Sequence, residues 1–301
     1  MVTSRPPCNF SPKVIQYIKT ANAETARVQM KAILITGAYG GMGRAAVSRF
    51  VADGYTVFAL DIHTDGAQRG IISITADLRD EESVIAVVNT VRQHTDRLDA
   101  ILHFAGMYNL DSLVEISDDD FRRILDINLR GAYLVNKHFL PLLERGSRIL
   151  ITTSELAALD PLPFTGIYAV TKAALDKYAY SLAMELQLLG ISVSVLRAGA
   201  VDTGMLGVST AALDRFCSGT ELYTCNADRF KGIVDSVEAR SIKPEKIANK
   251  CAKILGKRHP RFAYAINRNP LLLLLNALPK RLQLFAIRTV LKPKKDKKTG
   301  K

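Results

Sequence analysis

The sequence has few cysteines and no long apolar run. Its four cysteines, in a chain of 301 residues, show neither metal-site spacing nor the density of a disulfide framework. We therefore expect reduced thiols, no metal site and a cytoplasmic protein. No run of about 20 apolar residues and no secretory signal pattern is present, so the sequence does not predict a membrane-spanning helix.

Acidic residues are almost missing from the C-terminal end. Between Lys257 and Lys301 the sequence holds 13 lysines or arginines and one acid, Asp296, which accounts for the whole net charge of +12. A nucleic-acid-binding domain would be expected to spread its positive charge over one face of the fold. This distribution indicates a basic tail on a neutral body, with no nucleic acid as partner.

Short β-branched segments alternate with helix-favouring segments through most of the chain. Apolar content of 48% and charged content of 23% are typical of a globular protein with a sizeable core. The alternation predicts an α/β domain with a mostly parallel sheet. The strands are expected at 31–36, 56–60, 71–76, 98–104, 148–151, 191–196 and 261–266. The helices are expected at 11–28, 44–53, 80–95, 117–143, 168–189, 244–255 and 282–291.

A glycine-rich turn, Gly37-Ala38-Tyr39-Gly40-Gly41-Met42-Gly43, follows the first predicted strand and precedes a helix. In that context the backbone N–H groups and the helix dipole can hold a pyrophosphate. Asp61, at the end of the second predicted strand, can accept both hydroxyls of an adenine ribose and would repel a 2′-phosphate. Because no lysine or arginine occupies 38–42 or 62–64, the sequence predicts NAD rather than NADP.

Ser154, Tyr168 and Lys172 are candidates for a proton-transfer site. On a helix, Tyr168 and Lys172 would lie one turn apart, with about 5–6 Å between their Cβ atoms. A neighbouring ammonium favours the phenolate, so we expect Lys172 to lower the pKa of Tyr168. Ser154, at the end of a strand, would hold the substrate oxygen. An ordinary surface pair is the alternative for the Tyr-x-x-x-Lys spacing taken alone.

The motifs Thr36-Gly37-x-x-x-Gly41-x-Gly43, Ser154 and Tyr168-x-x-x-Lys172 together resemble the short-chain dehydrogenase/reductase family, and within it the NAD-dependent hydroxysteroid- and retinol-type dehydrogenases. The resemblance covers roughly 31–262. It implies a single doubly wound Rossmann-type domain, with a mostly parallel seven-stranded sheet and helices on both faces. It also implies reversible hydride transfer between NAD and an alcohol or ketone.

The resemblance also implies a role for each site residue. Tyr168 would be the acid/base, Lys172 would hold the nicotinamide ribose, Ser154 would orient the substrate, and Asn128 would support the proton path. The implied cofactor contacts are Gly37, Tyr39, Gly41, Met42, Gly43, Asp61, Ile62, Asp77, Leu78, Ala105, Gly106, Tyr168, Lys172, Val201 and Thr203.

Two positions depart from the family's pattern. His103-Phe104 stands where the family usually has two asparagines before Ala105-Gly106, which leaves open whether His103 replaces the missing support of the central sheet. Ala198 replaces a proline before Gly199, so we expect a less rigid loop there.

We expect three parts: an N-terminal extension (1–30), an NAD-binding catalytic domain (31–268) and an apolar, basic tail (269–301). Within the domain, 204–240 would form a lid over a lipophilic alcohol such as a steroid, retinoid or other lipid. The tail could lie on the cytosolic face of a membrane, or pack on the body or at the interface of a homo-oligomer, a dimer or tetramer.

Two functions of other classes remain as alternatives. One is a non-catalytic NAD sensor, against which intact Ser154, Tyr168 and Lys172 count. The other is a membrane scaffold, in which the basic tail would be the functional part.

Overall fold

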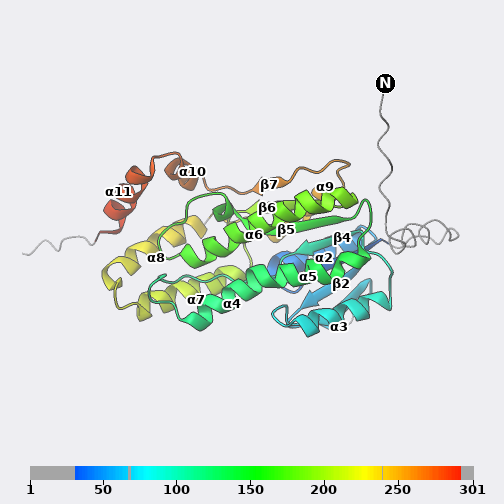
Figure 1. Cartoon of the computed structure of the whole chain (residues 1–301). Helices are drawn as coiled ribbons and strands as arrows, with labels where there is room; N and C mark the ends of the chain where they lie inside the picture. The colour runs from blue at the N-terminus through cyan, green and yellow to red at the C-terminus, as the bar shows by residue number, and fades with distance from the viewer. Residues whose placement is uncertain (1–30, 67–68, 239, 293–301) are drawn as a thin grey trace, which may run out of the picture. The chain divides into compact units, whose positions relative to one another are not determined.

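The computed structural model of the chain describes residues 31–66, 69–238 and 240–292, and Figure 1 shows their arrangement. The helix predicted at 11–28 and the lysines after Lys292 lie outside the described residues. The described part forms one compact unit. Its elements follow the predicted alternation of strands and helices.

The described residues form a sheet of seven strands in the order β3-β2-β1-β4-β5-β6-β7. Each neighbouring pair runs parallel, which makes the sheet wholly rather than mostly parallel. The strands are β1 (Ala32–Thr36), β2 (Thr56–Asp61), β3 (Ile71–Thr75), β4 (Ala100–His103), β5 (Arg148–Ser154), β6 (Ser192–Ala198) and β7 (Ala263–Ile266).

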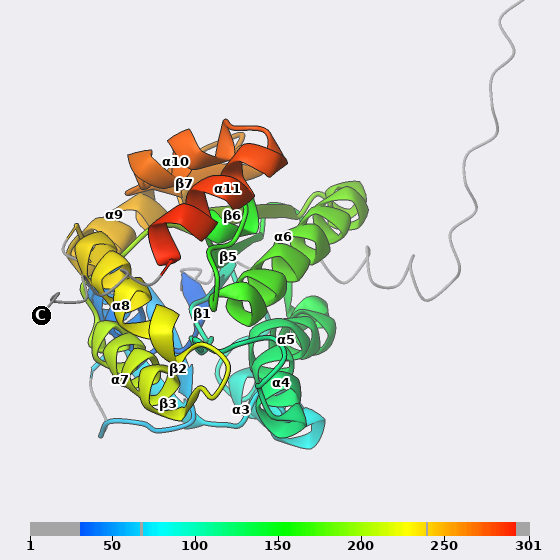
Figure 2. The same cartoon turned by 90° about the vertical axis from the view of Figure 1, so that its left-hand side faces the viewer.

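Helices connect these strands and extend beyond the last one (Figures 1 and 2). They are α2 (Gly41–Ala52), α3 (Glu81–Arg92), α4 (Asp118–Leu125), α5 (Gly131–Phe139), α6 (Gly166–Leu186), α7 (Gly204–Gly219), α8 (Thr224–Glu238), α9 (Pro244–Leu255), α10 (Pro270–Asn276) and α11 (Lys280–Leu291).

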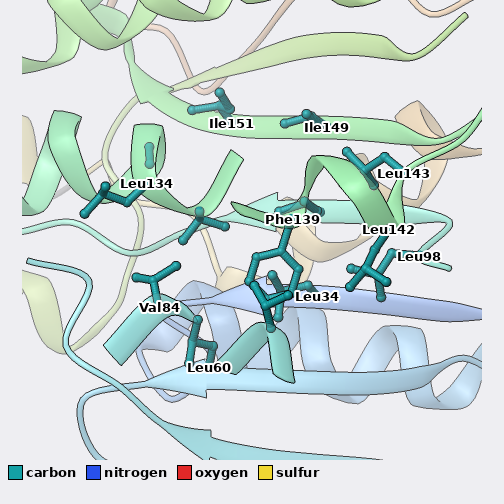
Figure 3. Close-up of a cluster of buried hydrophobic side chains, with 14 of the residues drawn as sticks. Leu34, Leu60, Val84, Leu98, Leu134, Phe139, Leu142, Leu143, Ile149 and Ile151 are labelled. Carbon is teal, nitrogen blue, oxygen red and sulfur yellow. The ribbon is translucent and has the colours of Figure 1, made fainter. Parts of the chain in front are cut away.

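One face of the sheet is covered by α3, α5 and α6. Alternate strand side chains such as Leu34, Leu60 and Ile149 meet Val84 of α3 and Phe139 of α5 in one buried cluster (Figure 3). The helix side chains recur at the spacing that places them on one side of each helix. A cluster of this extent is the main source of stability for the fold.

The other face of the sheet is covered by α2 and α9. Ile33 and Ile35, whose side chains alternate with Leu34, pack with Phe50 of α2 and Ile247 of α9. Because both faces are buried, the strands are almost continuously apolar. The two layers define a doubly wound α/β domain.

The order of the strands creates a crevice at the carboxyl edge of the sheet. The chain runs from β1 to β2 and β3 in one direction, and then returns to place β4 on the other side of β1. The connections on the two sides therefore diverge after β1 and β4, which is where ligands bind in open α/β sheets.

The C-terminal segment folds against the body of the domain. Asn269 caps α10 by accepting hydrogen bonds from the backbone N–H of Leu271 and Leu272, at 2.9 and 3.4 Å. The side chain of Asn226 in α8 donates to the carbonyl oxygen of Leu291 in α11, at 2.7 Å. No helix within the described residues is long and apolar enough to cross a membrane.

Several boundaries differ from the sequence-based expectations. The single helix expected at 117–143 is divided, because a π-helical turn (Asp126–Arg130) separates α4 from α5. The region 204–240, which showed no strong periodicity, forms two helices whose inner sides share a buried cluster with α11. Strand β5 extends beyond the apolar segment 148–151 and ends at Ser154, which confirms the predicted place of Ser154 at the end of a strand.

His103 supplies a buried polar connection across one layer. Its Nε2 lies 3.0 Å from Oδ1 of Asn136 in α5, and the Asn136 amide donates to the hydroxyl of Tyr178 in α6, at 3.2 Å. The chain of bonds ties β4 to two helices, so His103 does support the central sheet. Burial lowers the pKa of the His103 imidazole to about 4, because the charged form cannot be hydrated there.

This depressed pKa predicts a loss of stability in mild acid. In the unfolded state His103 binds a proton below its ordinary pKa of 6.5, whereas in the folded state it binds one only below about pH 4. The free energy of unfolding should therefore fall by about 2 kcal/mol at about pH 5 because of this group. His103→Asn removes the titration and should flatten this part of the pH profile. Urea denaturation of both proteins at about pH 7 and pH 5 measures the difference, and parallel profiles would contradict the assignment.

Candidate active site

A cavity of about 1370 Å³ lies at the carboxyl edge of the sheet, along the loops that follow β1, β2, β3 and β4. Most of the expected cofactor residues line it. They are Gly37, Tyr39, Gly41, Met42, Gly43, Asp61, Ile62, Asp77, Leu78, Ala105, Gly106 and Thr203.

The glycine-rich turn is closed by contacts that exclude a side chain. Gly37 has a φ of +66°, and a Cβ there would lie 2.5 Å from the backbone nitrogen of Ala105. A Cβ on Gly43 would lie 2.0 Å from the carbonyl oxygen of Gly37. Helix α2 begins at Gly41, three residues earlier than expected, so its first N–H groups belong to the turn. This is the backbone geometry that a pyrophosphate requires.

Asp61 is held at the end of β2 by two backbone N–H groups. Its carboxylate accepts hydrogen bonds from Tyr39, at 2.8 Å, and from Ile62, at 2.7 Å. Both bonds keep the carboxylate on the wall of the cavity. A fixed negative charge is therefore present where the resemblance places the adenine ribose.

Arg44 brings a cation into the same part of the cavity, which the sequence analysis missed. Its Nε donates to the carbonyl oxygen of Tyr39 at 2.8 Å, and its guanidinium lies 5.3 Å from the Tyr39 ring centroid. Asp65 forms an ion pair with it, which lowers the pKa of the Asp65 carboxyl. Arg44 lies outside the segments 38–42 and 62–64, but its side chain extends from the first turn of α2 back to Tyr39 of the glycine-rich turn.

The other expected cofactor contacts, Asp77, Thr203 and Val201, differ in their neighbours and in their position relative to the cavity. Asp77 lines the cavity, but its carboxylate pairs with Arg79 at 2.6 Å, and this bond lowers its pKa. Thr203 packs over the turn, because a Cβ on Gly41 would lie 2.6 Å from the Thr203 Cβ. Val201 is buried and bridges to Ile242. It does not line the cavity, so its expected contact with the cofactor stays a prediction.

Ser154, Tyr168 and Lys172 come together next to Gly106 and Tyr108 of this cavity, although none of the three is among its lining residues. Ser154 is the last residue of β5, and Tyr168 lies in the first turn of α6, where the side chains of the two residues are hydrogen-bonded. Lys172, one turn further along α6, places its Nζ 5.6 Å from the centroid of the Tyr168 ring. A tyrosine and a serine can therefore share one substrate oxygen.

The pKa shifts of this pair differ from the expectation that Lys172 would lower the pKa of Tyr168. Although part of the Tyr168 side chain stays accessible, burial raises the pKa of the phenol to about 12, and the hydrogen bond with Ser154 opposes this only in part. Burial also lowers the pKa of the Lys172 ammonium to about 8. The surrounding protein thus disfavours both charged forms.

Asn128 lies in the π-helical turn and fastens the loop after β4 to α6. Its Oδ1 accepts from the backbone N–H of Met107 at 2.7 Å, and its Nδ2 donates to the carbonyl of Met107 at 2.9 Å and to Oγ1 of Thr171 at 3.0 Å. Gly106 passes close by, because a Cβ there would lie 3.2 Å from both Asn128 Oδ1 and Lys172 Nζ. Asn128 therefore positions the backbone beside Lys172.

Tyr108 is a further site residue that the sequence analysis missed. Its ring meets that of Tyr168 edge-on, with 4.7 Å between the ring centroids, and it lines the cavity together with Leu110 and Phe216. Nothing in the spacing of the motifs points to it. Its contact places an aromatic lining residue directly beside Tyr168.

The turn between α7 and α8 is joined to the loop after β4 by Glu115. Its carboxylate accepts from the hydroxyl of Thr220 at 2.8 Å and from the N–H groups of Glu221 and Leu222 at 2.9 and 3.0 Å. These bonds lower the pKa of Glu115, with the Leu222 N–H as the largest contributor. The turn between α7 and α8 is therefore held over the cavity by one charged side chain.

Comparison with known proteins agrees with this geometry. The family model for short chain dehydrogenases matches residues 31–214, and the chain belongs to that family. The oxidoreductase UcpA of Escherichia coli is 32% identical over 186 residues, which cover 58% of this chain and 71% of that protein. Estradiol 17-beta-dehydrogenase 2 of Mus musculus is 28% identical over 208 residues, or 64% of this chain and 54% of that protein.

A solved structure shows the same fold. The 3-ketoacyl-(acyl-carrier-protein) reductase from Brucella melitensis, complexed with NADH, has a TM-score of 0.64 at 23% identity, covering 80% of this chain and 98% of its own. Membership of the family implies an oxidoreductase that uses a nicotinamide cofactor. The substrate and the choice between NAD and NADP are separate questions.

The three hydrogen bonds of Asn128 predict a structural and a catalytic effect. Asn128→Ala leaves the polar backbone groups of Met107 without their partners, so we expect a loss of about 2–3 kcal/mol in the free energy of unfolding. Turnover should also fall, because the loop that carries Gly106 and Met107 loses its bonds to α6, the helix that carries Lys172. Asn89→Ala, at an exposed position in α3, is the matched control. Equal melting temperatures of the two variants would contradict this role.

Proposed function

We propose that the protein is an NAD-dependent dehydrogenase that interconverts a lipophilic alcohol and its ketone or aldehyde. The observation that carries the proposal is the grouping of Ser154, Tyr168 and Lys172 beside a cavity lined by the glycine-rich turn. Tyr168 contacts the lining residue Tyr108, and Lys172 lies close to the lining residue Gly106. The alternatives of a non-catalytic sensor or a scaffold do not account for a buried acid/base pair.

The cavity fits a nicotinamide dinucleotide. The close approach at Gly37 and Gly43 leaves space and N–H donors for the pyrophosphate, and the fixed carboxylate of Asp61 suits the two ribose hydroxyls. Lys172 would hold the second ribose. When bound, the cofactor would accept the hydride in its oxidised form, NAD+, and supply it in its reduced form, NADH.

The remaining chemistry belongs to the side chains of the protein. Ser154 holds the substrate oxygen, and Tyr168 donates a proton to that oxygen during reduction or removes it during oxidation. With a pKa of about 12 the phenol is protonated at neutral pH, which suits the acid role directly. In the base role the ammonium of Lys172 offsets the charge that develops on the phenolate.

A lipophilic substrate is supported by the ring of Tyr108, which contacts Tyr168, and by Leu110 and Phe216 in the same cavity lining. The mouse relative is named for estradiol, a steroid alcohol. Apolar walls with few polar groups favour substrates whose binding comes from burial of apolar area.

Replacing the phenol provides the first test of this proposal. Tyr168→Phe should reduce turnover at least about 100-fold, because the proton carrier is lost, while binding of NAD stays intact. Tyr180→Phe, at an exposed position of the same helix, is the matched control and should keep wild-type turnover. A panel of lipophilic alcohols and ketones is assayed by nicotinamide absorbance. Residual turnover within about tenfold of wild type would refute the role of Tyr168.

The choice of cofactor provides a second test. Wild-type protein should have a higher kcat/KM with NAD than with NADP, because the carboxylate of Asp61 would repel a 2′-phosphate. Asp61→Asn should lower the ratio of kcat/KM with NAD to kcat/KM with NADP at least about tenfold, because kcat/KM with NADP increases. Asp53→Asn removes one negative charge at the far end of α2 and should leave the ratio unchanged. A wild-type preference for NADP would contradict the proposal.

A further inference from the structure

Helix α11 leaves large apolar side chains uncovered on its outward side. Phe285 is 68% exposed and Leu282 is 51% exposed, and they lie three residues apart, on one side of the helix. Arg281 and Arg288 flank Phe285 at helical spacing and are exposed as well. These four residues form a mixed apolar and basic stripe, which we name the α11 stripe.

The α11 stripe cannot turn inward, because the opposite side of the helix is fixed to the domain. Leu291 is buried with the lid residues Phe216 and Phe230, and its carbonyl oxygen accepts from Asn226 of α8. At the other end of the helix, Lys280 forms an ion pair with Asp160. Figures 1 and 2 both show α11 beside α8.

Apolar exposure continues on the neighbouring loop. Leu113 and Val114 are 57% and 72% exposed, and they line a second cavity of about 510 Å³ together with Leu284 and Ile287 of α11. Phe164 lines this cavity, and its ring lies 4.4 Å, centroid to centroid, from that of Phe216, which lines the cofactor cavity. The two cavities therefore approach each other at the contact between these two rings.

The charge of the C-terminal segment is almost entirely positive. The stretch 270–292 contains four basic residues and no acidic one, and the sequence beyond it adds five lysines against one aspartate. Two copies of the chain meeting through α11 would bring like charges together. An anionic surface with an apolar interior complements both the basic and the apolar side chains.

We propose that the α11 stripe, with Leu113 and Val114, docks on the surface of a bilayer that contains anionic lipids. Phe285 and Leu282 enter the interface, and Arg281 and Arg288 lie at the level of the headgroups. The second cavity then opens toward the lipid, beside the lid. This proposal goes beyond the proposed function and does not depend on it.

Binding to vesicles tests the proposal without an assay of activity. The full chain should co-sediment with vesicles of phosphatidylcholine and phosphatidylserine at low salt. Binding should weaken at high salt, and with phosphatidylcholine alone it should be at least about tenfold weaker. Leu282→Glu/Phe285→Glu should reduce partitioning at least about tenfold.

Leu188→Glu/Leu189→Glu is the matched control. These leucines are also exposed, at 80% and 54%, but they follow the end of α6 that lies away from Tyr168. This variant should bind vesicles like wild type. Circular dichroism and melting temperature establish that both variants are folded.

Three results would overturn the proposal. The first is equal vesicle binding by both double variants, and the second is no binding of the wild type at low salt. The third would make this face a contact between subunits: sedimentation velocity shows a wild-type dimer, and the α11 double variant alone dissociates it without a change in vesicle binding.

Discussion

Removal of water from Tyr168 and Lys172 is the constraint on which the site depends. Burial raises the pKa of the phenol to about 12 and lowers that of the ammonium to about 8. In water the two pKa values lie in nearly the same range, and desolvation moves them apart. Because the two pKa values are moved apart, Tyr168 keeps its proton at neutral pH. Lys172 lies close enough to stabilise a negative charge that develops on the phenolate.

The fold supplies this environment through close backbone contacts at the carboxyl edge of the sheet. Ser154 ends β5 and meets the first turn of α6, while Asn128 holds the loop after β4 against the same helix. Gly37 lies against the backbone of Ala105, which brings the loops after β1 and β4 together. The same edge therefore carries both the pyrophosphate-binding turn and the acid/base pair.

The sequence predicted the strands, the glycine-rich turn and the grouping of Ser154, Tyr168 and Lys172, because each is carried by a local pattern and by the order of elements. It did not predict the π-helical turn at Asn128, the reach of Arg44 or the contact of Tyr108 with Tyr168. Those depend on side-chain directions and on packing between distant segments. The direction of the Tyr168 shift was also wrong, since spacing reveals a neighbouring charge but not the loss of water around it.

The most direct test is the pKa of Lys172 in the folded protein, which depends on burial and on no assumption about substrate. Lysine labelled with carbon-13 at Cε can be followed by NMR over a pH titration, with Lys172→Met identifying the resonance. An inflection at about pH 8 is expected, well below the ordinary lysine pKa of 10.5. Titration of Lys172 together with the exposed lysines would contradict it.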